Sequence, residues 1–256
     1  MKTVWLRGVP VGEGRPKIAV PVIPGCPEEF AGQLRRLSEV PFDIVEFRAD
    51  CYGEGWEPGR MLEDLAQLRQ SAGEAPVLFT LRTREEGGCM AVTPEQYAGI
   101  NRVAAQSGLV DAVDVEVFHF EEMARELIGF VHNCGLPVVG SNHHFEGTPD
   151  EDEIIRVMCG QQEMGCDILK IAVMPHESRD VITLLSATRR MCSDYACKPV
   201  VTMSMGRLGV VSRLCGQGFG SAVTFGLVDK ASAPGQIPAE KLMQVLEIVD
   251  QAMEEK

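Results

Sequence analysis

The sequence predicts a TIM-type (β/α)8 barrel, and three observations support this prediction. Eight short apolar runs of β-like composition alternate with stretches that show helical periodicity. The chain has 256 residues, which is about the length of one such barrel. No low-complexity tract or Pro/Ser-rich linker divides it, so we expect a single domain over residues 1–256.

The expected strands follow one another along the whole chain, at spacings that suit one βα unit each. They span residues 17–22, 43–50, 77–83, 111–117, 137–143, 168–173, 199–205 and 221–226. Proline with acidic residues behind it is a typical helix opening, and it occurs at Pro27, Pro94, Pro149 and Pro238. Residues 3–6 and 12–14 precede the first strand, and we expect them to form a β-hairpin that closes the bottom of the barrel.

Alternating βα units imply a parallel sheet, and eight of them imply a closed barrel. The competing fold is an open doubly wound sheet, which would usually carry a GxGxxG motif after its first strand. No such motif follows residue 22. In a barrel the chemistry lies at the C-terminal ends of the strands, so polar residues at those ends are the candidates for function.

Composition excludes several classes of partner. The chain has 24 basic and 37 acidic residues, and a net charge of -13 argues against binding to nucleic acid or to anionic membranes. No run approaches the roughly 18 apolar residues that span a bilayer, and residues 1–17 lack a signal-peptide segment. Nine cysteines, an odd number without a CxxC motif, favour reduced thiols in a cytoplasmic protein.

Lys170 is the most informative residue, because it interrupts the apolar run of residues 168–173. A buried ammonium group is costly unless it is paired or loses its proton. A neutral buried amine is a nucleophile towards carbonyl groups, which favours a Schiff-base lysine. The alternative is a structural lysine that reaches water or pairs with a carboxylate, and this strand alone does not decide between the two.

Polar residues also occupy the ends of strands two to four. Period-two alternation places Glu46, Arg48 and Asp50 on one face, where they form either an internal salt-bridge ladder or contacts to a polar substrate. Thr80 and Arg82 share a face of the third strand.

Further acidic residues follow. Glu86 comes after the third strand, in a loop with two glycines. Asp114 and Glu116 share a face of the fourth strand, and we interpret them mainly as partners of the cationic side chains.

His143 ends the fifth strand and is a natural general acid and base, because its unperturbed pKa lies near neutrality. Its neighbour His144 should point to the opposite face. A metal site is the alternative, but it would need further ligands, and no HxH or HExxH motif is present.

Five more candidates lie at the end of the seventh strand or after the seventh and eighth strands. Met203 and Met205 share a face and suit either core packing or the apolar wall of a pocket. Arg213 is able to clamp a carboxylate, and Ser232 and Gln236 are able to read hydroxyl groups.

Together these segments resemble the type I 3-dehydroquinate dehydratase family over nearly the whole chain. Each segment alone is weak evidence for this resemblance, but the order and spacing of the segments together are specific to the family. They are Glu46-Phe47-Arg48-Ala49-Asp50, Thr80-Leu81-Arg82, Glu86-Gly87-Gly88, Ser141-x-His143, Lys170-Ile171-Ala172, Met203-Ser204-Met205-Gly206, Ser212-Arg213 and Ala233-Pro234-Gly235-Gln236.

The resemblance implies dehydration of 3-dehydroquinate to 3-dehydroshikimate in the shikimate pathway, by a cytoplasmic homodimer without metal or organic cofactor. It implies that Lys170 forms the Schiff base, that His143 is the general acid and base, and that Glu86 positions the histidine. Substrate contacts are implied for Glu46, Arg48, Arg82, Met203, Met205, Arg213, Ser232 and Gln236.

Two residues depart from the family pattern. His144 stands where Asp or Asn is usual, and Pro21 stands where some members have serine. Two other functions stay open on the residues alone. A class I aldolase would also use a lysine imine in a barrel, but would cleave a carbon–carbon bond. A catalytically silent ligand-binding barrel would need neither Lys170 nor His143.

Overall fold

The predicted barrel is present in the computed structural model, which describes residues 3–229 and 232–254 and, for residues 53–55, the backbone alone. Eight parallel strands form the barrel, and each lies in or against one of the eight expected runs. They are β3 (Lys17–Val22), β4 (Ile44–Arg48), β5 (Val77–Thr80), β6 (Ala112–Glu116), β7 (Val138–His144), β8 (Ile168–Val173), β9 (Val200–Ser204) and β10 (Val223–Leu227).

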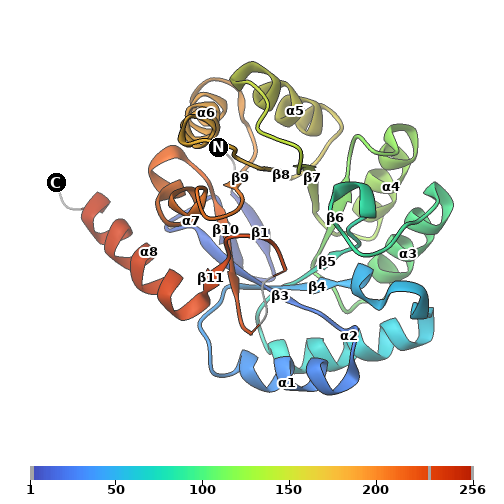
Figure 1. Cartoon of the computed structure of the whole chain (residues 1–256). Coiled ribbons are helices and arrows are strands. Elements are labelled where there is room, and N and C mark those ends of the chain that lie inside the picture. The colour runs from blue at the N-terminus through green and yellow to red at the C-terminus, as the bar shows by residue number, and fades with distance from the viewer. Residues whose placement is uncertain (1–2, 230–231, 255–256) are drawn as a thin grey trace.

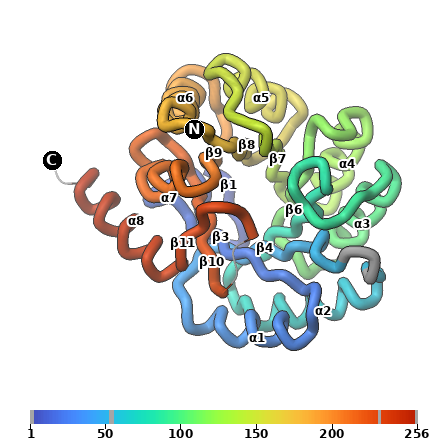
Figure 2. Tube along the Cα trace, viewed as in Figure 1, coloured from blue at the N-terminus to red at the C-terminus, as the bar shows by residue number. Residues whose placement is uncertain are grey.

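The sheet closes on itself, and its seam lies between β9 and β10. Strand β10 pairs in parallel with β3, so segments from the two ends of the chain lie side by side (Figure 2). On its other side β10 meets β9 through one bridge, between Val200 and Ser221, and the amide of Ala222 donates to the Val200 carbonyl over 2.7 Å. A short strand that the sequence did not predict, β11 (Ile237–Pro238), extends the sheet from β10.

Helices form a ring outside the strands (Figure 1). They are α1 (Pro27–Leu37), α2 (Pro58–Ala72), α3 (Pro94–Gln106), α4 (Glu121–Asn133), α5 (Glu151–Glu163), α6 (Ser178–Arg190), α7 (Val210–Cys215) and α8 (Ala239–Glu254). Short helical segments lie in four of the connections between strands and helices, namely η1 (Ala49–Gly55), η2 (Arg84–Glu86), η3 (Met191–Tyr195) and η4 (Gly216–Phe219).

Two of the four predicted helix openings need correction. Pro27 and Pro94 occupy the first helical positions of α1 and α3, as expected. Helix α5 instead begins after Asp150, whose side chain accepts a hydrogen bond from the Glu153 amide, so that Pro149 lies outside the helix. Pro238 belongs to β11 and directly precedes α8. Among the described residues, no helix has the length and apolar character that crossing a bilayer requires.

The N-terminal hairpin is present, but its second strand is not the one expected. Strand β1 (Val4–Leu6) pairs antiparallel with β2 (Val9–Val11), whereas residues 12–14 form the bend that leads into β3. Gly12 and Gly14 have φ angles of 98° and 66°, which glycine adopts readily. Leu6 and Val11 are buried in one apolar cluster with Ile44 and other inward-facing residues, so the hairpin covers the N-terminal end of the barrel.

The interior of the barrel changes from apolar to polar along its axis. Inward-facing residues at the starts of the strands are apolar, as Ala19, Leu78 and Ala112 show. Further along the same faces the side chains are polar, and they include Glu46, Asp114 and Lys170. Outward-facing residues such as Val113, Val115 and Val117 pack against the helices. This arrangement places a buried polar layer directly beneath the C-terminal mouth of the barrel.

Candidate active site

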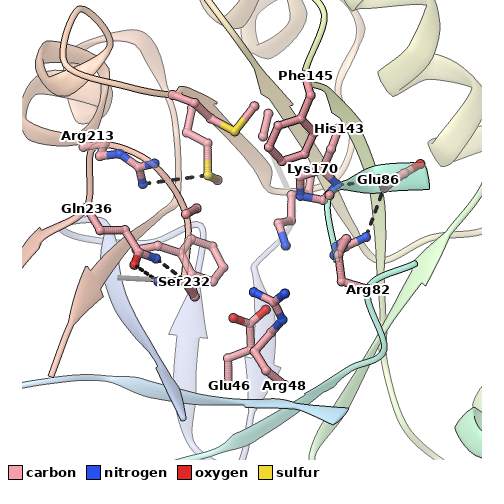
Figure 3. A pocket seen from close by; sticks show the side chains of 16 residues that line it. Glu46, Arg48, Arg82, Glu86, His143, Phe145, Lys170, Arg213, Ser232 and Gln236 are labelled. Atoms are coloured by element: carbon pink, nitrogen blue, oxygen red, sulfur yellow. Dashed lines mark hydrogen bonds and ion pairs between the residues drawn. The ribbon is translucent and has the colours of Figure 1, made fainter. Parts of the chain in front are cut away.

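A cavity opens at the C-terminal ends of the strands. Every side chain that the sequence predicted for the site lines it. These are Glu46, Arg48, Arg82, Glu86, His143, Lys170, Met203, Met205, Arg213, Ser232 and Gln236. In Figure 3 Lys170 points into the middle of the cavity, with His143 and Glu86 on one side and Arg213 and Gln236 on the other.

Lys170 is the centre of the cavity floor and is 4% exposed. Its Nζ donates a hydrogen bond to Asp114 Oδ2 over 3.0 Å and lies 4.9 Å from the ring centroid of Phe225. The structural alternative for this lysine is therefore partly realised, since the ammonium does pair with a carboxylate. The pairing does not remove Lys170 from the cavity, because the side chain still lines it.

The backbone of Lys170 is held by a residue that the sequence analysis missed. Gln161 in α5 accepts a hydrogen bond from the Lys170 amide over 3.0 Å and donates one to its carbonyl over 2.9 Å. Gln161 is completely buried. One side chain thus satisfies both the amide and the carbonyl of Lys170, which fixes the position of the Lys170 backbone. A helix glutamine carries no sequence signal that would separate it from a surface residue.

Arg82 connects the acidic residues beneath the cavity. Its Nη2 lies 2.7 Å from Asp114 Oδ1, and its Nη1 lies 2.9 Å from Glu116 Oε1 and donates to Ser141 Oγ over 2.9 Å. Asp114 and Glu116 are thus partners of the cations, as expected. Burial would raise the pKa of Asp114, but Arg82 and Lys170 and the Ser141 hydroxyl outweigh it and lower that pKa to about 2. Asp114 is therefore ionised at neutral pH.

His143, which is partly buried, and Glu86, which is buried, form a pair at the edge of the cavity. His143 Nδ1 lies 2.8 Å from Glu86 Oε2, and Asn142 Nδ2 donates to Glu86 Oε1 over 3.3 Å. Burial and the positive charges of Arg82, Lys170 and Arg48 hold the pKa of His143 well below its usual value. Burial and the nearby carboxylates raise the pKa of Glu86 well above its usual value.

Phe145 covers this pair. Its ring stacks on that of His143 with centroids 6.5 Å apart. It also lies against Gly87, where an added Cβ would come within 2.2 Å of the ring. Phe145, like Phe225, lines the cavity without having been predicted, because an apolar residue at a strand end looks like ordinary core.

The salt-bridge alternative for the second strand is also partly realised. Asp50 accepts hydrogen bonds from Nε and Nη2 of Arg48 over 2.8 and 2.9 Å. Glu46 Oε1 instead accepts from the hydroxyl of Thr80 over 2.8 Å. Arg48 and Glu46 nevertheless line the cavity, so the pairing orients Arg48 without withdrawing it.

Arg213 differs from the other buried arginines of the site, because no described carboxylate pairs with it. Its Nη2 donates to the Pro234 carbonyl over 3.1 Å, its Nη1 lies 4.0 Å from the sulfur of Met203, and its Nε has no partner among the described residues. Burial lowers the pKa of Arg213 to about 10. A cation that lines a cavity with unused donors is suited to bind an anionic ligand.

Ser232 and Gln236 lie close to Arg213 and are bonded to each other. The Gln236 side chain accepts from the Ser232 amide over 2.7 Å and donates to its hydroxyl over 3.0 Å. Ala231, which precedes them in the predicted loop, lies outside the described residues. Both groups are able to exchange these mutual hydrogen bonds for bonds to a ligand in the cavity.

The two residues that depart from the family pattern lie at the margin of the site. His144 does not line the cavity; it lines a separate hollow together with Val157 and Gly160 of α5, and its buried Nε2 has no described partner. Burial lowers the pKa of His144. Pro21 pairs with Glu46 in the sheet register, so its missing hydroxyl would have faced the same layer of the barrel.

Comparison with known proteins agrees with this geometry. The family model described as type I 3-dehydroquinase matches residues 18–253. A 3-dehydroquinate dehydratase of Salmonella agona is 44% identical over 252 residues, which cover 98% of this chain and 100% of that protein.

Solved structures with high similarity have the same names. A type I 3-dehydroquinate dehydratase from Clostridium difficile with covalently modified comenic acid has a TM-score of 0.94 and 40% identity, and the match covers 98% of this chain and 99% of that chain. The 3-dehydroquinate dehydratase from Geobacillus kaustophilus has a TM-score of 0.93 and 33% identity, covering 100% and 98%.

Proposed function

Because this chain belongs to the type I 3-dehydroquinase family, whose activity is that of a hydro-lyase, we propose that it dehydrates 3-dehydroquinate through a covalent imine on Lys170. The dehydratase activity follows from the family. The covalent mechanism and the role of each residue are the proposed part. The observation that supports them best is the position of Lys170 and His143 on adjacent strands of one cavity wall, where His143 pairs with Ala172 in the sheet register.

The reaction removes water β to a ketone, and Lys170 makes this possible. The α-proton of a ketone is weakly acidic, and an imine with a protonated nitrogen is a better electron sink than the ketone itself. The ammonium of Lys170 first gives one proton to the neutral His143, and the freed amine attacks the carbonyl carbon. The carbonyl oxygen then leaves as water, which takes up this proton and a second one from the attacking nitrogen. The protonated imine carries the positive charge that the ammonium carried before, so Asp114 remains its counter-ion throughout.

His143 then transfers the protons. The low pKa of its ring keeps it neutral at pH 7, as a base requires, and it takes the α-proton to leave an enamine. The resulting imidazolium protonates the departing hydroxyl, and water is expelled as the enamine collapses to a conjugated imine. Water finally adds to this imine, releases 3-dehydroshikimate and regenerates the amine of Lys170. Glu86 holds Nδ1 of His143, which leaves Nε2 as the nitrogen that exchanges protons.

The remaining residues account for substrate binding. Arg213, with its unused donors, binds the carboxylate. Glu46, Arg48 and Arg82 contact the ring hydroxyls from the barrel floor, and Ser232 and Gln236 contact them from above. Met203 and Met205 form the apolar wall against the carbocycle. We further propose that the chain is one domain, acts as a cytoplasmic homodimer in the shikimate pathway to chorismate, and needs no metal or organic cofactor.

The test is reductive trapping. The protein is mixed with 3-dehydroquinate and reduced with borohydride, and the intact mass and the peptide map are measured. We expect one adduct, on Lys170, and no adduct in Lys170→Ala. Lys17→Ala is the matched control and should keep the adduct on Lys170. Lys17 is a second buried lysine on a barrel strand, but its Nζ donates to the Glu13 and Arg15 carbonyls at the other end of the barrel.

Each outcome has a definite meaning. An adduct that persists in Lys170→Ala, or full activity in that variant, would reject the imine on Lys170. A trapped adduct with cleaved rather than dehydrated product would instead identify an aldolase. The same trapping with His143→Ala should show the imine accumulating while turnover stops.

A further inference from the structure

A second group of reactive side chains lies beside the cavity and has no part in the proposed reaction. The Oδ of Asp50 and the sulfur atoms of Cys51 and Cys89 all lie within 4.8 Å of one another. Cys51 follows β4 three residues after Arg48, and Cys89 lies three residues after Glu86. The two thiols thus face each other from the segments that directly follow Arg48 at the end of β4 and Glu86 at the end of η2.

We propose that Cys51 and Cys89 are a redox-sensitive dithiol site, which closes to an intramolecular disulfide by exchange with a low-molecular-weight disulfide and thereby slows dehydration. The sulfur atoms are already close, and both residues are held by one carboxylate. Asp50 Oδ2 accepts a hydrogen bond from the Cys89 amide over 3.1 Å and a weak one from the Cys51 thiol over 3.7 Å.

A metal ion is the alternative occupant, and the contacts of Asp50 disfavour it. Both of its oxygens are already used by Arg48, over 2.8 and 2.9 Å, and the Cys89 amide takes a further position on Oδ2. A cation would have to displace Arg48, and a buried arginine without its partner is costly. Two thiols remain, which is fewer ligands than a structural zinc site uses.

The exchange has a defined order, because the two thiols differ in exposure. Cys89 is exposed, whereas Cys51 is partly buried. Burial and the charge of Asp50 raise the pKa of Cys51, so Cys51 stays protonated longer. The thiolate of Cys89 therefore attacks the oxidant and displaces one thiolate. Cys51 then gives its proton to water, attacks the sulfur of Cys89 and displaces the second. Two protein thiols become one disulfide, and the oxidant becomes two thiols.

Formation of the disulfide should change the geometry of the proposed active site. The sulfur atoms must approach from within 4.8 Å to roughly 2 Å. The loop that carries Cys89 is tied at its base, since the Gly88 amide donates to the Thr83 carbonyl over 2.7 Å and the Arg84 amide donates to the Met90 carbonyl over 2.9 Å. Displacement of Cys89 should therefore also displace Glu86, because Glu86 lies in the chain between the residues that these two hydrogen bonds join. Glu86 in turn contacts His143.

The experiment oxidises the full chain with glutathione disulfide at graded ratios to glutathione, blocks free thiols, and maps peptides without reduction. We expect a peptide pair linked through Cys51 and Cys89 and an intact mass lower by two hydrogen atoms. In Cys51→Ser the mixed disulfide should stay on Cys89, and in Cys89→Ser the link should not form. Cys134→Ser is the matched control, because Cys134 is exposed and lies at the end of α4.

Activity is then measured on the cross-linked protein. We expect kcat to fall severalfold, to recover with a reducing agent, and to be insensitive to the oxidant in Cys51→Ser. Persistence of the mixed disulfide in the native chain, or a link through other cysteines alone, would overturn the site. So would a repeat of the oxidation in the presence and in the absence of Zn²⁺ that forms no disulfide at any ratio and leaves both thiols free. Unchanged kcat in fully cross-linked protein would overturn the inhibition. The link is read by mass, so its failure is distinct from failure of the imine mechanism.

Discussion

The ammonium of Lys170 lies 3.0 Å from a carboxylate oxygen of Asp114, and neither side chain is more than 5% exposed. This ion pair explains how a lysine is tolerated in the middle of an apolar strand, because a buried charge is stable only with a partner. The other oxygen of Asp114 binds Arg82, so one carboxylate balances two cations. The charge of Asp114 is therefore needed both for folding and for holding the amine in place.

Asp114→Asn tests this role. At pH 7 the substitution leaves Arg82 and Lys170 without their counter-ion, and breaking a buried pair in this way costs about 3–5 kcal/mol of unfolding free energy. We expect a loss of this size in urea unfolding, together with a lower kcat. Asp111→Asn is the control, because Asp111 pairs with Arg7 and Arg69 at the other end of the barrel. It should lower stability but leave kcat unchanged.

The difference in unfolding free energy between the native chain and Asp114→Asn should decrease as the pH falls. The pKa of Asp114 is about 2 in the folded chain, against 3.8 without the fold, so the folded state binds fewer protons. Its contribution of about 2 kcal/mol is present above pH 4 and disappears as the pH falls towards 2. The stability gap between the native chain and Asp114→Asn should therefore narrow in acid. A gap that stays constant down to pH 3 would contradict the lowered pKa.

His143 leads to a prediction about the pH profile of kcat. An ordinary histidine base would lose activity below its pKa of about 6.5. In this structure burial and three nearby cations lower the pKa of His143 well below 6.5, so the ring stays neutral over the range from pH 6 to 8. We expect kcat to show no acid limb near pH 6.5. A limb centred there in steady-state rates would show that His143 is not held neutral by its surroundings.

Much of this site was predictable from sequence for a simple reason. Strand period fixes which residues face inwards, so Glu46 and Arg48, or Met203 and Met205, were assigned to one face before their contacts were known. Barrel geometry then brings the C-terminal ends of all the strands to one mouth. Residues far apart in the chain, such as Lys170 and Arg213, therefore line the same cavity.

The parts that sequence missed depend on contacts between elements. Gln161 holds Lys170 from a helix, and its role appears only when α5 is packed against β8. Phe145 lines the cavity at the edge of β7, where an apolar side chain gives no polar signal. The second strand of the hairpin was misplaced because glycines at residues 12 and 14 mark a bend after the strand and not the strand itself.

Arg213 should control substrate affinity more than turnover. No carboxylate among the described residues pairs with Arg213, so the carboxylate of a bound substrate would be the first one to pair with it. Losing a bidentate, charge-assisted contact should raise KM about ten- to hundredfold, with a smaller change in kcat. Steady-state kinetics of Arg213→Ala test this. Arg207→Ala is the control, because Arg207 lies in the turn before α7, is exposed and is outside the cavity. Equal KM values for the two variants would refute the assignment.

Gly87 should be needed for the alignment of His143. It has a φ angle of 83°, and a Cβ added there would lie 2.2 Å from the ring of Phe145. Gly87→Ala must therefore displace Phe145 or the end of η2, and both flank the contact between Glu86 and His143. We expect a loss of about 1–3 kcal/mol in stability and a fall in kcat larger than any change in KM.

Gly59→Ala separates this effect from the general effect of replacing a glycine. Gly59 lies in α2, where an added Cβ meets nothing within 4 Å, and helix propensity favours alanine by about 1 kcal/mol. This variant should keep full kcat and gain slightly in stability. Because a lost alignment leaves the amine intact, Gly87→Ala should still give the borohydride adduct on Lys170 while turning over slowly. Loss of the adduct together with kcat would show instead that the whole cavity had collapsed.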